Sequence, residues 1–278
     1  MIDSPARPVL RSGTALATLD PAAGGRLAGL SVDGVQLLKT SGAGVVAWGC
    51  YPMAPWAGRL RDGVLAWRGA THQLPIHLGA PHAMHGTVIE TAWEIIAADE
   101  RSATLAAPLG RVWPFAGRGV QDFRLEPVAL RATITVEAAD AEFPAVVGWH
   151  PWFLRHLRAP DGTPFGGPAE ILLPAGGMLR RGPDYLPNGE VVRPIPPGPW
   201  DDCFVDLVGV PGVRWPGAME VALESDVAYW VCYTQPPEAV CLEPQTGPPN
   251  GLNTGECAVV GPGRPLTASM TLRWSLLA

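Results

Sequence analysis

Two ionisable residues of this chain each follow a short apolar run and stand directly before a proline. His150 comes after the apolar residues 145–149 and precedes Pro151. Glu243 follows the run "AVCL" and precedes Pro244. An imidazole exchanges protons near neutral pH, and burial raises the pKa of a carboxylate toward the range of a useful base. Together they form the smallest pair that can take a proton from one oxygen and give one to another.

Each of the two residues also has a purely structural interpretation. His150 could be a core histidine that hydrogen-bonds a backbone carbonyl, and Glu243 could form a structural ion pair with an arginine. The proline after each residue fixes the local backbone, which suits a side chain that must be held in one position. The combination of acid and histidine favours the chemical interpretation.

His82 and His85 form an H-x-x-H pair, a spacing that zinc ligands can have. The chain has no H-E-x-x-H motif and no cysteine cluster, so we expect no metal. Other segments that we expect to be loops carry Arg59, Asp201 and several of the 11 tryptophans. Charged and imidazole groups hydrogen-bond hydroxyls, and aromatic faces pack against the C–H faces of sugars. These residues indicate a polyhydroxylated ligand, although most of the tryptophans belong to the core.

Composition excludes several other classes of protein. The net charge is −6 and no basic run occurs, so we expect neither nucleic acid nor an anionic membrane surface as a partner. The first 13 residues lack the apolar stretch of a signal peptide, and no apolar run is long enough to span a membrane. Five scattered cysteines predict free thiols and a cytoplasmic location. Phosphate-binding glycine motifs and the G-x-S-x-G motif are absent from the sequence.

The 33 glycines and 31 prolines divide the chain into short pieces, which disfavours long helices. Apolar and polar residues alternate along 130–138, as in a half-buried strand, and 229–235 and 270–277 are rich in aromatic and β-branched residues. The dipeptide Asp33-Gly34 predicts a hairpin turn within 25–38. These patterns predict an all-β protein, a large antiparallel β-sandwich with its site in loops at a sheet edge.

Two segments are less regular. Residues 91–107 contain alanine and glutamate that would suit a helix, but we predict two strands that turn at 99–102. Residues 174–200 are the most loop-like part of the chain, yet apolar residues recur there, so we predict an ordered excursion. Because no linker separates the segments, we expect residues 1–278 to form a single domain.

Five stretches, in this order, resemble the aldose 1-epimerase (mutarotase) family. They are "AGRLRDG" with Arg59, "MHGT" with His85, "GWHPWF" with His150, "DDCF" with Asp201, and "EPQTGPPNGLN" with Glu243. They span residues 51–253, so the resemblance covers most of the chain. The chain departs from the family pattern where "AGR" replaces an asparagine before the arginine and where "HGT" replaces H-G-G, which bears on the substrate.

The resemblance implies a galactose mutarotase-like supersandwich with no metal or organic cofactor. It implies that Glu243 is the general base and His150 the general acid in opening and reclosing a sugar ring. His85, Arg59 and Asp201 would bind sugar hydroxyls, with His82 near them. Asp202 stands beside Asp201, so the sequence leaves the identity of the binding aspartate open.

Three hypotheses follow. The leading one is a mutarotase that interconverts the α and β anomers of a free neutral aldose, as a monomer or homodimer. A second is a mutarotase of a charged sugar, either a hexose 6-phosphate or a sulfonated or acidic sugar. Candidate anion ligands for that sugar are Arg155, Arg158, Arg180 and Arg181. The third is a carbohydrate-binding domain without catalysis. The stretch "HGTVIETAW" lacks the arginine that is usual after H-G in the hexose-6-phosphate branch, which favours the neutral sugar.

Overall fold

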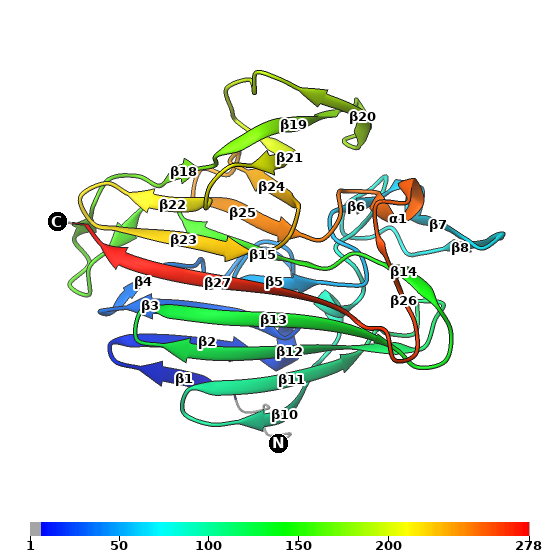
Figure 1. Cartoon of the computed structure of the whole chain (residues 1–278). Helices are drawn as coiled ribbons and strands as arrows, with labels where there is room; N and C mark the ends of the chain where they lie inside the picture. The colour runs from blue at the N-terminus through cyan, green and yellow to red at the C-terminus, as the bar shows by residue number, and fades with distance from the viewer. Residues whose placement is uncertain (1–6, 278) are drawn as a thin grey trace.

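The computed structural model describes residues 7–277, and two antiparallel sheets make up most of this part of the chain (Figure 1). The larger sheet has 11 strands. Its order is β1 (Val9–Ser12), β2 (Ala15–Asp20), β3 (Arg26–Val32), β5 (Cys50–Met53), β15 (Gly148–Leu154), β25 (Ala239–Gln245), β24 (Tyr229–Tyr233), β21 (Asp201–Leu207), β19 (Ala175–Arg181) and β20 (Pro187–Val192), with β4 (Val35–Gln36) paired to β3.

The second sheet has eight strands and covers one face of the first. Its order is β10 (Glu94–Ala98), β11 (Ser102–Pro108), β12 (Gly117–Glu126), β13 (Ala129–Ala138), β27 (Leu266–Leu276), β23 (Met219–Ser225), β22 (Gly212–Trp215) and β18 (Glu170–Leu172). Small pairs complete the fold: β6 (Arg59–Leu60) with β9 (Ala83–Met84), β7 (Val64–Trp67) with β8 (Ala70–Gln73), β14 (Phe143–Ala145) with β26 (Ala258–Val260), and β16 (Leu157–Arg158) with β17 (Pro164–Phe165). The helix α1 (Gly251–Thr254) is a single turn.

The alternating segments form strands as predicted. In β13 Leu130, Ala132, Ile134 and Val136 are buried while Arg131 is exposed. Asp33 and Gly34 both have positive φ angles, 50° and 78°, which a tight turn between paired strands requires. Strands β10 and β11 form the hairpin predicted for residues 91–107, and the carboxylate of Asp99 accepts hydrogen bonds from the backbone of the turn. The all-β prediction is confirmed.

The hydrophobic core lies between the two sheets. Phe153 of β15 contacts Trp215 of β22, with ring centroids 6.2 Å apart. Side chains alternate across a strand, so this contact means that Phe153 faces the second sheet. His150 and Trp152 occupy alternate positions along β15 and therefore face the other way. That outer face of the larger sheet is where the loops gather.

Residues 174–200 are ordered, as predicted, but they hold two strands of the larger sheet. Strands β19 and β20 form a hairpin at one edge of that sheet and lie at the top of Figure 1. All five cysteines are free, as expected. Among residues 7–277, no helix is long and apolar enough to cross a membrane. The prediction that the N-terminus carries no signal peptide rests partly on residues 1–6, which lie outside the described residues.

Candidate functional site

The strand register aligns His150 with Glu243. Gly148 pairs with Gln245 and Trp152 pairs with Cys241 across β15 and β25, so the position midway between these pairs sets His150 opposite Glu243. Residues opposite one another in an antiparallel pair project from the same face of the sheet. The same alignment continues into the neighbouring strands and gives one row across five strands, the acid–base row: Tyr51, His150, Glu243, Val231 and Cys203.

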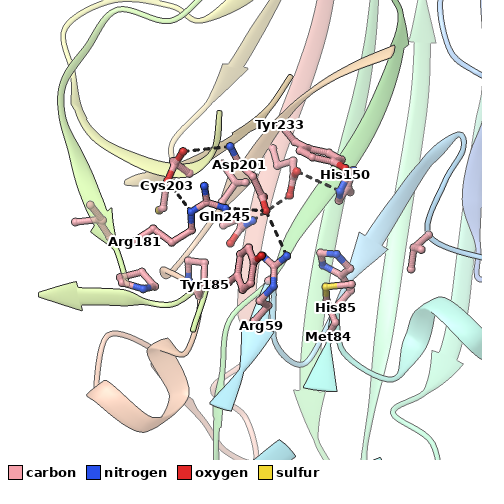
Figure 2. Close-up of a pocket in the computed structure, with 18 of the residues that line it drawn as sticks. Arg59, Met84, His85, His150, Arg181, Tyr185, Asp201, Cys203, Tyr233 and Gln245 are labelled. Atoms are coloured by element: carbon pink, nitrogen blue, oxygen red, sulfur yellow. Dashed lines mark hydrogen bonds and ion pairs between the residues drawn. The ribbon is translucent and has the colours of Figure 1, made fainter. Parts of the chain in front are cut away.

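Within the acid–base row, His150 Nε2 lies 3.1 Å from Glu243 Oε1, a distance that a shared proton can bridge (Figure 2). Both residues are buried, with 5% and 2% of their surfaces exposed. The imidazole is held between Tyr51 and Trp152, whose rings stack on it at centroid distances of 4.7 and 5.3 Å. Gln245 Nε2 donates to the second carboxylate oxygen of Glu243 at 3.3 Å. These contacts fix both reactive groups.

Burial pushes both members of the pair toward their uncharged forms. It raises the pKa of Glu243 well above its ordinary value, and the nearby Asp201 carboxylate raises it further. It lowers the pKa of His150 well below its ordinary value, with a smaller contribution from His85. A pair of this kind holds one proton between its members over a range of pH, and the two groups titrate together. Such a pair can accept a proton at one atom while releasing one at another.

His85 lies in a short turn and contacts His150 of the acid–base pair. Its backbone has a φ of 62°, and the next residue, Gly86, has a φ of 79°. A Cβ atom at Gly86 would lie 1.9 Å from the carbonyl oxygen of Ala54, so only glycine fits there. The imidazole of His85 packs edge-on against that of His150 at 5.2 Å. Burial lowers the pKa of His85 to about 3, so it is a neutral hydrogen-bonding group.

A second group of residues along the same cavity consists mainly of arginines and aspartates that form ion pairs. Asp201 Oδ2 lies 3.3 Å from both Arg59 Nη2 and Arg181 Nη1, and Arg181 Nε lies 3.1 Å from Asp202 Oδ1. Both guanidinium groups lie over the ring of Tyr185, each 5.3 Å from its centroid. Figure 2 shows Arg59, Arg181, Asp201 and Tyr185 on the same side of the cavity. We call these four residues and Asp202 the ionic wall.

Loops bring the parts together. Arg59 belongs to β6, which pairs with β9 directly before His85, and the His85 backbone nitrogen donates to Gly58. The backbone nitrogen of Asn250 donates to the carbonyl of Arg59 at 2.7 Å. This hydrogen bond ties the stretch "PPN", residues 248–250, to the backbone of Arg59. Distant segments of the chain build one site in this way.

The cavity encloses about 890 Å³ of empty space, part of which is open to solvent. It is lined by five of the six residues predicted from the sequence: Arg59, His85, His150, Asp201 and Glu243. Other polar or aromatic side chains that sequence reasoning did not assign to sugar binding also line it, among them Tyr51, Trp152, Arg181, Tyr185, Tyr233 and Gln245. Arg181 was considered there only as one of four arginines for a charged sugar.

His82, expected near the sugar-binding groups, is not among the residues that line the cavity. Its Nδ1 accepts from the Asp62 backbone at 3.0 Å, and its Nε2 is 2.7 Å from the Asp184 carbonyl. Both ring nitrogens are occupied, so His82 ties two loops together. No cluster of three metal-ligating side chains occurs within residues 7–277.

Three of the four arginines considered as anion ligands make other contacts. Arg155 donates to three backbone carbonyls, Arg158 to the carbonyl of Gly162, and Arg180 to Glu190. Only Arg181 lines the cavity, and two aspartates already pair with it.

A model of the aldose 1-epimerase family matches residues 11–159, more than half of the chain. The chain belongs to the aldose 1-epimerase family. The family resemblance proposed from five sequence stretches is thereby confirmed. The matched region contains Arg59, His85 and His150, while Asp201 and Glu243 lie beyond it.

Individual proteins agree with the family assignment. An uncharacterised Escherichia coli protein, YphB, is 25% identical over 284 residues, covering 90% of this chain and 92% of its own length. An aldose 1-epimerase candidate from Escherichia coli K12 has the same fold, with a TM-score of 0.84 and 22% identity over 98% of this chain and 99% of its own. A galactose mutarotase-like protein from Clostridium acetobutylicum has a TM-score of 0.82 and 17% identity over 97% and 95% of the two chains. These structures establish the galactose mutarotase-like sandwich of this family member.

Proposed function

We propose that this protein is an aldose 1-epimerase, an isomerase that interconverts the α and β anomers of a free neutral aldose. The observation that carries the proposal is the buried contact of 3.1 Å between His150 and Glu243 on the floor of a cavity open to solvent. The ionic wall supplies hydrogen-bonding groups for sugar hydroxyls beside that contact. Membership of the aldose 1-epimerase family supports the same reaction.

The chemistry needs only the one proton that the pair shares. The sugar's anomeric hydroxyl and ring oxygen insert between the two side chains, with His150 protonated and Glu243 ionised. Glu243 takes the proton of the anomeric hydroxyl while His150 protonates the ring oxygen, and the ring opens. Burial favours the resulting state, a neutral imidazole and a protonated carboxyl. After rotation about the C1–C2 bond, both protons return as the ring closes on the other face of the aldehyde.

Charge balance in the cavity favours a neutral substrate. The two guanidinium groups that line it, of Arg59 and Arg181, are both paired with aspartates. An anionic group on the sugar would have to replace these carboxylates and would meet Glu243 nearby. Asp201, which contacts both arginines, is the aspartate we assign to hydroxyl binding, and Asp202 holds Arg181 in place.

The test is anomer exchange, followed by NMR on freshly dissolved aldoses and their 6-phosphates and compared with the spontaneous rate. We expect acceleration for at least one neutral aldose. Binding of sugars without acceleration would instead establish the non-catalytic carbohydrate-binding domain. Acceleration confined to the anionic sugars would overturn the neutral assignment and leave the acid–base proposal in place.

We also propose that the chain forms one domain, because one hydrophobic cluster contains buried residues from both sheets. The proposed partner is a monosaccharide. The cytoplasmic location rests on the five free thiols, four of them buried.

A further inference from the structure

Arg26 is a fully buried arginine whose presence the proposed reaction does not explain. It has no exposed surface. Its Nε donates to the carbonyl of Ala23 at 2.6 Å, and its Nη1 donates to the carbonyl of Trp48 at 2.9 Å. Its Nη2 is buried and has no hydrogen-bond partner among the described residues. Burying a guanidinium is costly, so a side chain held in this way calls for a physical reason.

The strand register makes Arg26 the next member of the acid–base row. Leu27 pairs with Cys50 across β3 and β5, which sets Arg26 opposite Tyr51. The Arg26 guanidinium carbon is 5.4 Å from the centroid of the Tyr51 ring, and that ring in turn stacks on His150 at 4.7 Å. The cation therefore lies behind Tyr51, on the side of its row away from Glu243.

Arg26 also holds one wall of the cavity. Its guanidinium lies over the ring of Trp48 at 4.1 Å and binds the carbonyl of the same residue. The Tyr51 hydroxyl donates to the carbonyl of Val46, which lines the cavity. A Cβ atom at Gly49 would lie 3.1 Å from Arg26 Cδ and 2.8 Å from the Leu27 carbonyl, so glycine leaves room for the arginine. The segment 46–49 is thus tied to the acid–base row at two points.

The charge of Arg26 is not cancelled by a directly bound carboxylate. Among the described residues, none forms an ion pair with it. Asp20, opposite Arg26 in the register of β2 and β3, contacts Arg7 at 2.6 Å instead. Burial lowers the pKa of Arg26 only to about 10, so it remains a cation at neutral pH. A fixed charge in a poorly solvated region acts over a longer distance than one at the surface.

We propose that Arg26 is a positioning residue for the acid–base pair, acting through Tyr51: it fixes the Tyr51 ring and the 46–49 wall, and its positive charge makes His150 a stronger acid. A cation behind the imidazole raises the free energy of the imidazolium, which then gives its proton to a sugar ring oxygen more readily. The proposal rests on the assignment of His150 as the acid.

Several ionisable groups surround the imidazole and contribute to its acidity. Tyr51 of β5, His85 of the 85–86 turn and Glu243 of β25 contact it directly. Arg26 of β3 lies behind the Tyr51 ring. Burial is the main cause of the lowered pKa of His150, followed by His85, with Arg26 acting in the same direction. A backbone hydrogen bond of His150 acts in the opposite direction and raises its pKa, and the Glu243 carboxylate lies 3.1 Å from the ring. Removing the Arg26 charge therefore leaves an imidazole that is easier to protonate.

The experiment compares Arg26→Met and Arg26→Lys with wild type, and uses Arg131→Met on the other sheet, where the arginine is half exposed, as a control. The His150 ring is followed by NMR during a pH titration of histidine-labelled protein, and anomer exchange is measured over the same pH range. We expect Arg26→Met to raise the pKa of His150 and to move the low-pH limb of the rate profile to higher pH by the same amount. Arg26→Lys keeps the charge and should stay within a few tenths of wild type.

A folded Arg26→Met with an unchanged His150 titration overturns the proposal and leaves Arg26 as a packing residue. If Arg26→Met does not fold, Arg26→Gln decides, because it removes the charge and keeps a hydrogen-bonding side chain: a raised pKa of His150 supports the role of the charge, and an unchanged pKa contradicts it. The NMR readout does not need activity. A wild type without anomer exchange would therefore end the proposed function, while the effect of Arg26 on the imidazole would still be measured.

Discussion

The acid–base row and the ionic wall line the same cavity but treat ionisable groups in opposite ways. His150 and Glu243 are both buried, the imidazole lies between two aromatic rings, and among residues 7–277 neither forms an ion pair with an arginine or lysine. Burial favours their neutral forms. Arg59 and Asp201 are partly exposed and are paired with each other. Burial without a fixed counter-ion yields groups that trade protons, whereas pairing yields groups that keep their charge and can orient a ligand. In the proposed mechanism, proton transfer and substrate binding therefore fall to different groups of residues in one cavity.

The largest effect should come from the acid–base row. We expect Glu243→Gln and His150→Asn each to lower kcat for anomer exchange by about 10²–10⁴-fold, because each removes one partner of the proton transfer. The double variant should lose little more than either single variant, since the two act as a unit. Stopped-flow polarimetry measures the rates, with Glu238→Gln, an exposed carboxylate next to β25, as the control. Near-full activity in either variant would remove that residue from the mechanism.

The second-largest effect should be on the pH dependence of stability, and it comes from the buried imidazole of His85. The folded-state pKa of His85, about 3, is below its unfolded value of about 6.5, so its contribution to stability is present above pH 6.5 and is lost as the pH falls toward 3. His85→Asn keeps a residue that tolerates positive φ and removes this titration. Between pH 7 and 4 its free energy of unfolding should fall by about 3 kcal/mol less than that of wild type. Urea unfolding at several pH values measures this, and parallel curves for the two proteins would contradict it.

The smallest of these effects should come from the ionic wall. Arg59→Ala removes a hydrogen-bond donor at the cavity and leaves Asp201 with one arginine, so KM should rise about ten- to hundredfold with little change in kcat. Arg180→Ala is the matched control, because Arg180 is exposed, pairs with Glu190 and stands beside Arg181. A loss confined to kcat would move Arg59 from binding to the chemical step and would erase the separation between the two regions.

The sequence predicted the class of fold and most of the charged groups at the candidate site, because both leave local signals. Alternation and turn dipeptides mark strands, and proline-framed polar residues stand out from apolar runs. Tyr51 and Trp152 leave no such signal, since an aromatic residue in an apolar segment has the pattern of a core residue. His82 and His85 share one short motif, yet the positive φ of His85 turns only that side chain into the cavity. Such differences depend on backbone direction, which spacing alone does not encode.

Arginines illustrate the same limit. Arg180 and Arg181 are consecutive arginines of β19 whose side chains make different contacts. Arg180 pairs with Glu190, whereas Arg181 pairs with Asp202 and lines the cavity. Arg26 has no motif at all, and its relation to His150 emerges only when three strands are aligned in register. Contacts between distant strands are set by tertiary pairing, and a single sequence contains no direct record of it.

The hairpin of β19 and β20 occupies the outermost position of the larger sheet, yet it carries Arg181 and Tyr185. The residues proposed to move protons are anchored on central strands instead. An edge hairpin can be lengthened, shortened or exchanged without disturbing the pairing of interior strands. Substrate preference can therefore diversify by replacing one peripheral segment, while the reaction itself is inherited unchanged.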